Sequence, residues 1–455
     1  MTRSMLLAAA ALTLAACGGT EALDPALGFG PNPTLPEPSS SLFPTVKIAP
    51  AVGWPAGETP VAAPGFRVAA FASGLDHPRW LYRLPNGDIL VAESNAPPKP
   101  EGEKGGLRGW IQGLVMKRAG AKVPSANRIT LLRDADGDGT AETRAVFLEN
   151  LRSPFGMALV GDRLYVANAD AVVAFPYQTG QTAITAAATT IADLPAQRNH
   201  HWTKSLVASA DGSRLYVGVG SNSNIGENGL DEEVNRAAVL EIDPATGATR
   251  VFASGLRNPV GMAWQPQSGA LWVAVNERDE LGDDLVPDYM TSVRPGGHYG
   301  WPWSYYGQIV DTRVEPANPA MVARAIKPDY ALGAHTASLG LTFYDGTSFP
   351  AAYSGGAFIG PHGSWNRTPP AGYKVIFVPF AGGQPVGPPQ DILTGFLNGE
   401  GEAMGRPVGV QTDRTGALLV ADDVGNVIWR VASTAAAPVA AQVATPAPRP
   451  SAPTT

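Results

Sequence analysis

Cysteine is almost absent from this 455-residue chain, and its only copy is Cys17. A chain with one cysteine has no internal disulfide, so its stability must come mainly from burial of a core. The C-x-x-C-H motif that attaches a c-type haem is also missing. After the first sixteen residues, no apolar run is long enough to form a membrane-spanning helix.

Charge is scarce as well, because only 16% of the residues are Asp, Glu, Lys or Arg. The formal net charge of −7 argues against nucleic acid as a partner. What is abundant is glycine and proline, with 52 and 42 copies spread between short apolar runs. This distribution is typical of many short strands joined by turns.

The N-terminus predicts export. Arg3 precedes an apolar run over residues 5–16, which is the length of a signal peptide, and Leu14-Ala15-Ala16-Cys17-Gly18 has the form of a bacterial lipoprotein cleavage site. We therefore expect a signal peptide at 1–16, lipidation of Cys17 and a membrane-anchored lipoprotein of the cell envelope. Gly18 after the cysteine favours retention in the outer membrane over the alternative of a periplasmic location.

Composition divides the remaining chain into three parts. Residues 17–43 are rich in Pro, Gly and Ser without a hydrophobic period, which predicts a tether. Residues 433–455 form an Ala/Pro/Thr tail that cannot build a core. One domain is expected between them, at 44–432.

That domain repeats itself. An apolar strand, a turn containing Gly or Asp, and a second apolar strand occur six times. The copies fall at 85–93, 156–168, 205–220, 261–275, 339–360 and 409–422. Six similar all-β units predict a six-bladed β-propeller with one unit per blade. A β-sandwich gives no reason for the same strand–turn–strand pattern to occur six times. Loops at one end of the central channel are then the expected place for chemistry.

Three clusters lie beside these repeats. His201 stands at a loop-to-strand junction in a chain with only six histidines, and a near-neutral imidazole can act as a general base. Arg257 and Asn258 precede a proline and offer fixed hydrogen-bonding groups. Acids and glycine over 276–284 favour a hard cation such as Ca²⁺. The aromatic stretch that follows, with Trp301, can wall a planar ligand.

Together these motifs resemble the soluble quinoprotein glucose dehydrogenase and sorbosone dehydrogenase family. The similarity to the sorbosone branch rests on LRNPVGMAW, NERDELGDD, HYGWPW and GPHGSWNR, and it covers about residues 65–432. The resemblance implies a bound pyrroloquinoline quinone with Ca²⁺. It further implies oxidation of aldoses or sugar-derived aldehydes by hydride transfer, and electron delivery to an external cytochrome or quinone.

The resemblance also implies roles for individual residues. His201 maps to the catalytic base, Arg257 lies beside the reacting oxygens, and Asn258 contacts the cofactor. The backbone carbonyls of Arg278 and Asp279 map to the ligands of the Ca²⁺ that polarises the quinone. One departure is that the paired arginines of the glucose-oxidising branch are reduced to Arg406. The branch's cofactor-binding lysine also has no clear counterpart, and Arg367, Lys374 or Lys204 could take its place.

A separate metal site is predicted from spacing alone. Residues 134–142 place the acids Asp134, Asp136, Asp138 and Glu142 around a glycine, as loops that curl around Ca²⁺ do. An EF-hand also has a glutamate at its twelfth position, but Ala145 stands there in this chain, and the flanking residues read as strands. We therefore expect a structural calcium loop on a β-hairpin.

Several alternatives stay open from the sequence. The insertion at 96–127 is either a lid that shapes substrate access or a plain surface loop. A lactonase-like propeller hydrolase is a second function, and it would need acidic side chains converging on a central metal. A non-catalytic surface propeller that binds carbohydrate or protein is a third, since propellers host unrelated activities.

Overall fold

The computed structural model describes residues 23–39, 47–98, 118–120 and 123–435. The predicted signal peptide, Cys17, most of the 96–127 insertion and nearly all of the C-terminal tail lie outside these ranges. Within the described ranges, no helix has the length and apolar character needed to cross a membrane.

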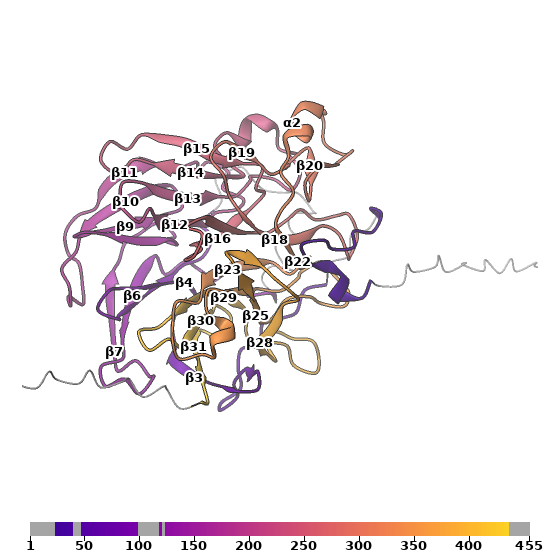
Figure 1. The fold of residues 1–455 in the computed structure, drawn as a ribbon. Helices are drawn as coiled ribbons and strands as arrows, with labels where there is room; N and C mark the ends of the chain where they lie inside the picture. Colours follow the sequence, from indigo (N-terminus) through magenta and orange to yellow (C-terminus); the bar gives the residue numbers. More distant parts are fainter. Residues whose placement is uncertain (1–22, 40–46, 99–117, 121–122, 436–455) are drawn as a thin grey trace, which may run out of the picture.

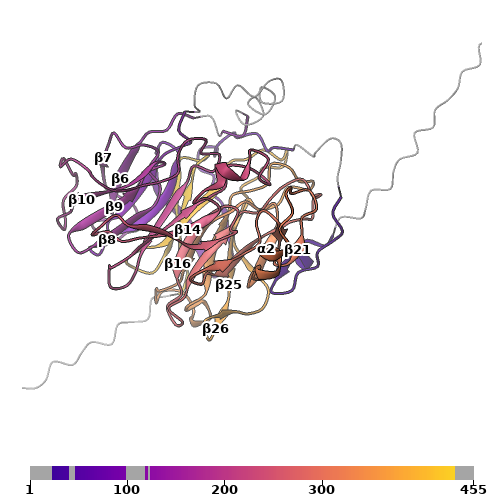
Figure 2. The same cartoon turned by 90° about the horizontal axis from the view of Figure 1, so that it is seen from above.

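The fold is the predicted six-bladed β-propeller, built from six antiparallel sheets with almost no helix (Figure 1). Each blade is built on a core of four strands, whose first three run in sequence order from the central channel outward. In blade three, β12, β13, β14 and β15 lie side by side (Figure 1). Figure 2 shows β9 and β10 of blade two at the left of the molecule and β25 of blade five near its lower middle.

The strands of the first three blades alternate in direction from one to the next. Blade one holds β4 (Pro78–Arg83), β5 (Ile89–Glu93), β6 (Arg128–Arg133) and β7 (Thr143–Leu148). Blade two holds β8 (Met157–Val160), β9 (Arg163–Ala167), β10 (Ala171–Pro176) and β11 (Thr189–Asp193). Blade three holds β12 (Lys204–Ala208), β13 (Leu215–Val219), β14 (Ala238–Ile242) and β15 (Thr249–Ser254), with β19 (Gly297–His298) added in parallel at its outer edge.

The other three blades incorporate strands from the N-terminal part of the chain. Blade four holds β16 (Pro259–Trp264), β17 (Leu271–Val275), β18 (Pro287–Ser292), β22 (Tyr330–Ala334) and β1 (Phe29–Gly30). Blade five holds β23 (Ser338–Phe343), β24 (Ala357–Pro361), β25 (Val375–Val378), β28 (Gln390–Thr394) and β2 (Val61–Ala62). Blade six holds β29 (Pro407–Thr412), β30 (Leu418–Asp422), β31 (Val427–Ser433) and β3 (Phe66–Ser73).

Short elements decorate this ring. They are the hairpins β20 (Ser304–Tyr305) with β21 (Ile309–Val310) and β26 (Phe380–Ala381) with β27 (Gln384–Pro385), the helix α2 (Pro319–Arg324), and the 3-10 turns Pro25–Gly28, Leu230–Glu233 and Ala351–Tyr353.

The repeated sequence unit is the inner strand pair of each blade. The second strands of blades one, three, four and six are buried at every position, because both faces pack against neighbouring blades. Outer strands are half exposed, and β7 alternates between intermediate and exposed residues before its buried end. Apolar clusters fill the wedges between blades, for example the one that joins Trp80 of blade one to Met157 of blade two.

Glycines let the inner strands approach one another around the channel. A Cβ added at Gly340 of β23 would lie 2.1 Å from the carbonyl oxygen of Val408 in β29. One added at Gly409 of β29 would lie 2.8 Å from the carbonyl oxygen of Arg79 in β4. The ring therefore closes on backbone-to-backbone contact where a side chain has no room.

Part of the segment predicted as a tether lies on the propeller. β1 pairs with β22, and the backbone N–H of Ser39 donates to the carbonyl of Leu281 at 3.0 Å. Leu35 packs against the apolar cluster between blades three and four. The described residues 23–39 are thus docked against the folded body; the boundary at residue 44 stays a prediction.

Candidate active site at one mouth of the propeller

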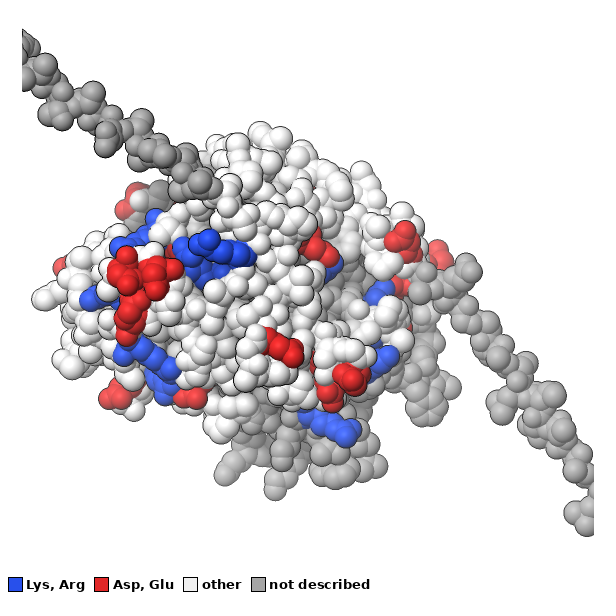
Figure 3. Space-filling model, turned by 90° about the horizontal axis from the view of Figure 1, so that it is seen from below, with Lys and Arg blue, Asp and Glu red and all other residues white. Residues whose placement is uncertain are grey.

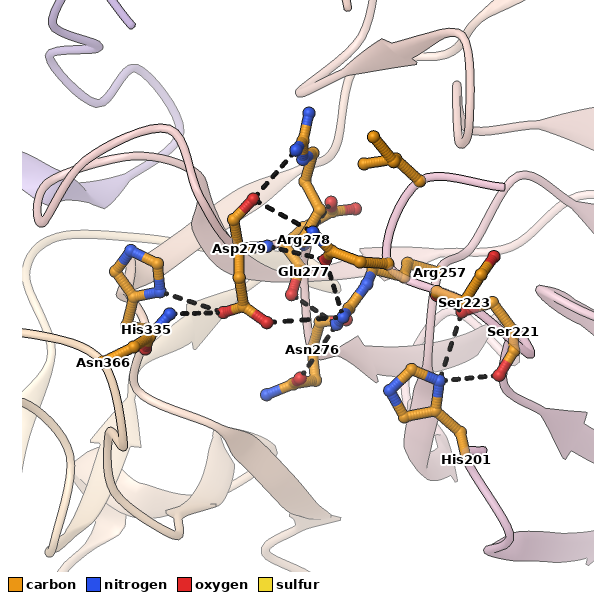
Figure 4. Close-up of polar contacts among 12 residues, drawn as sticks. His201, Ser221, Ser223, Arg257, Asn276, Glu277, Arg278, Asp279, His335 and Asn366 are labelled. Carbon is orange, nitrogen blue, oxygen red and sulfur yellow. Dashed lines mark hydrogen bonds and ion pairs between the residues drawn. The ribbon is translucent and has the colours of Figure 1, made fainter. Parts of the chain in front are cut away.

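The site residues predicted from the motifs meet at one mouth of the ring. His201 precedes β12, Arg257 and Asn258 precede β16, and Asn276 to Asp279 follow β17. The starts of inner strands and the ends of second strands share one mouth, since each blade repeats the same up-and-down order. Figure 4 shows His201, Arg257 and Asp279 in this region. A Cβ added at Gly220, just after β13, would lie 2.2 Å from Asn258 Oδ1 and 2.5 Å from the Cβ of His201, so these residues are neighbours.

His201 is oriented as a base. Its Nδ1 lies 2.8 Å from the carbonyl oxygen of Ser221 and 3.2 Å from the Ser221 hydroxyl, which donates its own proton to the carbonyl of Ser223 at 2.6 Å. Nδ1 therefore carries the proton and donates it to the carbonyl, which leaves a lone pair on Nε2. Burial, and then the charge of Arg257, hold the pKa of His201 well below its ordinary value, so the ring is neutral at pH 7.

Arg257 is 3% exposed and fixed from several sides. Its Nη1 donates to the carbonyl of Glu277 at 2.5 Å, and its Nη2 donates to Asn224 Oδ1 at 3.0 Å. Nη2 also lies 3.5 Å from the carboxylate of Asp279. This network holds the guanidinium plane in one orientation at the mouth, and its Nε has no partner among the described residues.

The carboxylate of Asp279 is the centre of a second network (Figure 4). One oxygen accepts hydrogen bonds from Asn366 Nδ2 at 2.9 Å and His335 Nδ1 at 3.3 Å, and the other faces Arg257. Burial alone would raise the pKa of Asp279, but His335 and Arg257 lower it overall, so the group is ionised. Burial alone would lower the pKa of His335, and the bond to Asp279 raises it instead.

Glu277 lies behind this network and is 5% exposed. Burial raises the pKa of Glu277 to about 8, even though Arg257 acts in the opposite direction. Its neighbour Asp288 has a pKa raised to about 6 by burial, despite hydrogen bonds from the backbone N–H groups of Glu277 and Ser338. Glu277 is therefore largely protonated at pH 7.

Lys204 and Arg236 donate hydrogen bonds that fix the loop that carries His201. The Lys204 side chain is fully buried and donates to Asn199 Oδ1 at 2.9 Å and the carbonyl of Trp202 at 3.1 Å. Arg236 donates to the same Asn199 oxygen at 2.8 Å and to the carbonyl of Gly220 at 2.7 Å. The amine of Lys204 is thus engaged within the His201 loop, and its predicted contact with a cofactor stays a prediction.

The other predicted cofactor ligands lie around the same mouth and are also engaged. Trp301 donates from Nε1 to the carbonyl of Asn224 at 2.9 Å. Arg367 joins the loops of blades four and five through the Asp283 carbonyl at 2.8 Å and the Asp284 carboxylate at 2.6 Å. Arg406 donates to the carbonyl of Ala49 at 3.1 Å and lies over the ring of Tyr373.

A further charged cluster at this mouth joins blades one, five and six. Asp423 is 2% exposed and accepts a hydrogen bond from Arg79 and one from His362 Nε2 at 3.0 Å, while His77 Nδ1 meets its backbone carbonyl at 3.0 Å. Burial and Arg79 lower the pKa of His77 to about 4, although Asp423 opposes this. Arg79 lies 5.9 Å from the ring of Trp202, the neighbour of His201.

The chemistry of the donors fits a quinone better than a calcium ion at this mouth. Asn258 Oδ1 is buried and has no hydrogen-bond partner among the described residues, so it suits a donor group of a bound planar molecule. The carbonyl of Asp279, predicted to bind Ca²⁺, instead accepts hydrogen bonds from Arg278 Nη2 at 2.8 Å and Asn224 Nδ2 at 3.2 Å. A calcium ion would have to displace these donors.

Calcium fits the hairpin loop between β6 and β7. One ligand atom from each of Asp134, Asp136, Asp138 and Glu142 lies within 4.8 Å of the others. In the described part of the chain this is the one acidic or histidine group with such spacing. Backbone N–H groups of the loop, such as that of Gly137 at 2.6 Å from Asp134 Oδ1, hold the carboxylates in place.

A cavity lies at the opposite mouth of the ring, between blades one, five and six. It has a volume of about 530 Å³ and is lined by residues that include Arg83, Asp345 and Asp413. On the face drawn in Figure 3, charged side chains of both signs occur in small scattered groups.

Similarity to known proteins agrees with this architecture. The chain is 32% identical over 239 residues to an uncharacterised protein of Borreliella burgdorferi. It is 24% identical over 364 residues to a pyrroloquinoline quinone-dependent pyranose dehydrogenase of Coprinopsis cinerea, and 32% identical over 101 residues to an aldose sugar dehydrogenase of Escherichia coli. These matches cover 51%, 70% and 22% of this chain and only 60%, 44% and 26% of the relatives.

Solved structures support the fold. The pyranose dehydrogenase domain of Coprinopsis cinerea in its holo form superposes with a TM-score of 0.66 at 20% identity, covering 85% of this chain and all of that domain. The aldose sugar dehydrogenase of Escherichia coli gives 0.57 at 17% identity, covering 81% of this chain and 99% of that one. The expected resemblance to quinone-dependent sugar dehydrogenases is confirmed, while the sorbosone branch stays a prediction.

Two sequence families match the chain directly. The family described as TrAA12-like matches residues 308–434. The family described as Domain of unknown function (DUF7133) matches residues 62–364, which is more than half of the chain, and the protein therefore belongs to the DUF7133 family.

Proposed function

We propose that this chain is a quinoprotein dehydrogenase that oxidises aldoses or sugar-derived aldehydes, with pyrroloquinoline quinone and Ca²⁺ as cofactors. The observation that carries the proposal is the geometry of His201, whose Nδ1 donates to a backbone carbonyl and whose Nε2 keeps a free lone pair beside Arg257 and Asn258. The relatives named for pyranose and aldose sugar dehydrogenation support the substrate class.

The residues have distinct tasks in this proposal. The quinone, when bound, would accept the hydrogen of the substrate's C–H bond as a hydride, which carries two electrons. His201 removes the hydroxyl proton through Nε2 and holds it as an imidazolium. Arg257 stabilises the negative charge that develops on the substrate oxygen. Asn258 is the residue placed to contact the cofactor, and calcium is assigned to the Asp134 loop.

A hydrolase of the lactonase type is less well supported. It needs carboxylates that converge on a metal at the channel mouth, and the metal-type cluster of the described residues lies instead in the β6–β7 hairpin. A non-catalytic propeller leaves the orientation of His201 without a role.

The test is dye-linked oxidation of an aldose panel by the purified full-length protein after incubation with pyrroloquinoline quinone and Ca²⁺. We expect His201→Ala to lower turnover by about 10²- to 10⁴-fold while cofactor affinity, measured by absorbance titration, is retained. His200→Ala is the matched control, since His200 is the exposed neighbour.

The pH profile adds a second measurement. Because the pKa of His201 is lowered, the acid limb of turnover should fall below pH 6.5. Full activity of His201→Ala, or no cofactor binding by the wild type under any condition, would contradict the proposal.

We also propose that the protein is held in the cell envelope through a lipid on Cys17 and passes its electrons to an external cytochrome or quinone. Metabolic labelling with a fatty acid should mark the wild type and not Cys17→Ser. Equal labelling of both forms would refute the anchor.

A further inference from the structure

The loop after β17 is bound internally by two arginines. Arg278 Nη2 donates to the carbonyl of Asp279 at 2.8 Å. Arg313, which lies 35 residues further along, donates from Nη1 to the carbonyl of Glu280 at 2.7 Å and from Nη2 to that of Asp279 at 3.4 Å. The carbonyls of Asp279 and Glu280 thus accept hydrogen bonds from guanidinium groups, and only the first of them belongs to the predicted ligand pair of Arg278 and Asp279.

One buried carboxylate, that of Asp311, forms an ion pair with each of these guanidinium groups. The Asp311 side chain is 2% exposed and forms an ion pair with Arg278, whose side chain is 1% exposed. Its other oxygen lies 3.7 Å from Arg313 Nε. Because an uncompensated charge is costly to bury, this arginine–carboxylate–arginine group resists rearrangement.

A metal ion can bind the carbonyl oxygen of Asp279 only if that oxygen has a lone pair that no hydrogen bond uses. A backbone carbonyl has two lone pairs, and that of Asp279 already accepts from Arg278, Arg313 and Asn224. A divalent cation placed there would also lie against two positive side chains, which repel it. Figure 4 shows the Asp279 carboxylate turned toward Arg257 and its carbonyl oxygen turned toward Arg278.

We propose that the arginine pair of Arg278 and Arg313 takes the place of a calcium ion at this loop, so that the redox site binds its quinone without a divalent cation. The positive charge that faces the site is then that of Arg257, which forms an ion pair with Asp279. The arginine pair fixes the loop that carries Asp279. The part of the inference that concerns the quinone rests on the proposed function, whereas the part that concerns metal binding does not.

The first experiment counts metal and measures cofactor affinity. We expect the wild type, dialysed against Ca²⁺, to hold one calcium by elemental analysis. The hairpin variant Asp134→Asn/Asp136→Asn/Asp138→Asn should hold none, with or without quinone. The Kd for pyrroloquinoline quinone should agree within about twofold in excess Ca²⁺ and in chelator.

The outcomes separate the two proposals. A second calcium in the wild type, or quinone binding only when Ca²⁺ is present, would overturn the arginine substitution. If the hairpin variant does not fold, the calcium count of the wild type still decides between one site and two. If quinone fails to bind in either buffer, the proposed function fails, and the metal count still tests the loop.

A second experiment tests the arginine pair itself. Arg313→Gln removes both of its donors to the loop while leaving the Arg278–Asp311 pair. We expect the Kd for quinone to rise several-fold, with no recovery when Ca²⁺ is added. The matched control is Arg324→Gln, an exposed arginine on α2. Unchanged affinity in Arg313→Gln, or recovery by Ca²⁺, would overturn the proposal.

Discussion

Asn224 connects the parts of the candidate site although it makes no motif. Its Oδ1 accepts from Arg257 Nη2 at 3.0 Å and from the backbone N–H of Asp279 at 2.9 Å, and its own carbonyl accepts from Trp301. One amide side chain thereby sets the distance between the arginine before β16 and the loop after β17. A side chain with this many fixed partners orients the groups around it.

Glu277 gives a prediction about stability and pH. The pKa of its carboxyl is raised to about 8 in the fold from an ordinary value near 4.5, so the folded state holds a proton that the unfolded state releases between these pH values. Its stabilising contribution is therefore complete below about pH 4.5 and is lost as the pH rises toward 8. Glu277→Gln should weaken the loss of stability between pH 5 and 8, measured by urea unfolding at each pH.

The control for this measurement is Glu280→Gln at an exposed acidic position of the same loop. An equal pH dependence in wild type and Glu277→Gln would show that the carboxyl is not protonated in the fold.

At the residue scale, the sequence predicted the groups that local motifs carry and missed those that closure of the ring supplies. His201, Arg257 and Asn258 stand in short recognisable segments, and the structure places them together. His335 and Asn366 reach Asp279 from 56 and 87 residues away; His335 stands in no quoted motif, and the GPHGSWNR motif that contains Asn366 gave no sign of this contact. Only the packing of blade five against blade four brings them there.

At the scale of one element, the β6–β7 hairpin predicts that Ca²⁺ stabilises the protein. Four carboxylates held close together without a cation repel one another, and Ca²⁺ removes this repulsion. We expect Ca²⁺ to raise the free energy of unfolding by about 2.7 kcal/mol when its free concentration is ~100 times the Kd. The change should be absent in Asp136→Asn.

Asp162→Asn, in the exposed turn between β8 and β9, is the matched control and should respond to Ca²⁺ as the wild type does. Thermal unfolding curves with chelator and with added Ca²⁺ measure the effect. Identical curves for the wild type in both buffers would rule out a structural calcium here.

The inner strands give a second prediction at this scale. Gly340→Ala should destabilise the protein by about 1–3 kcal/mol or more, because the new methyl group would meet the Val408 carbonyl at 2.1 Å. Gly399→Ala is the control, since no atom lies within 4 Å of a Cβ at that position. Urea unfolding of the two variants makes the comparison, and equal stability would show that the inner strands can separate.

The strands that could be predicted from the sequence are the ones that are buried. The inner strand pairs read as repeated apolar runs because both of their faces are covered. Outer strands such as β15 carry mostly exposed residues at their starts, so the sequence marks them weakly. The placement of β3 in blade six has no local signal, since its partner β31 lies more than 350 residues away.

For the whole molecule, the pairing of β3 with β31 closes the ring. Phe66 pairs with Ser433 at one end of this ladder and Ser73 pairs with Val427 at the other. Because each blade packs on two neighbours, we expect all six blades to unfold in one transition when the closing blade is damaged.

Val431→Asp tests this expectation. Val431 is fully buried in β31, and an unpaired carboxylate there should cost several kcal/mol. Tryptophan fluorescence and proteolysis of blade two should report the loss at the same urea concentration. Ala69→Asp on the exposed side of β3 is the control, with a change within about 0.5 kcal/mol. Separate transitions for different blades would contradict a cooperative ring.

The same ladder has a consequence for biosynthesis. During translation β3 is made early and its partner is made last, so an open strand edge must wait while the intervening five blades are completed. Until β31 arrives, that edge can pair with any other extended chain, including a second nascent copy. Chaperones that shield extended segments should therefore matter most for this protein in the seconds before its final strand is released.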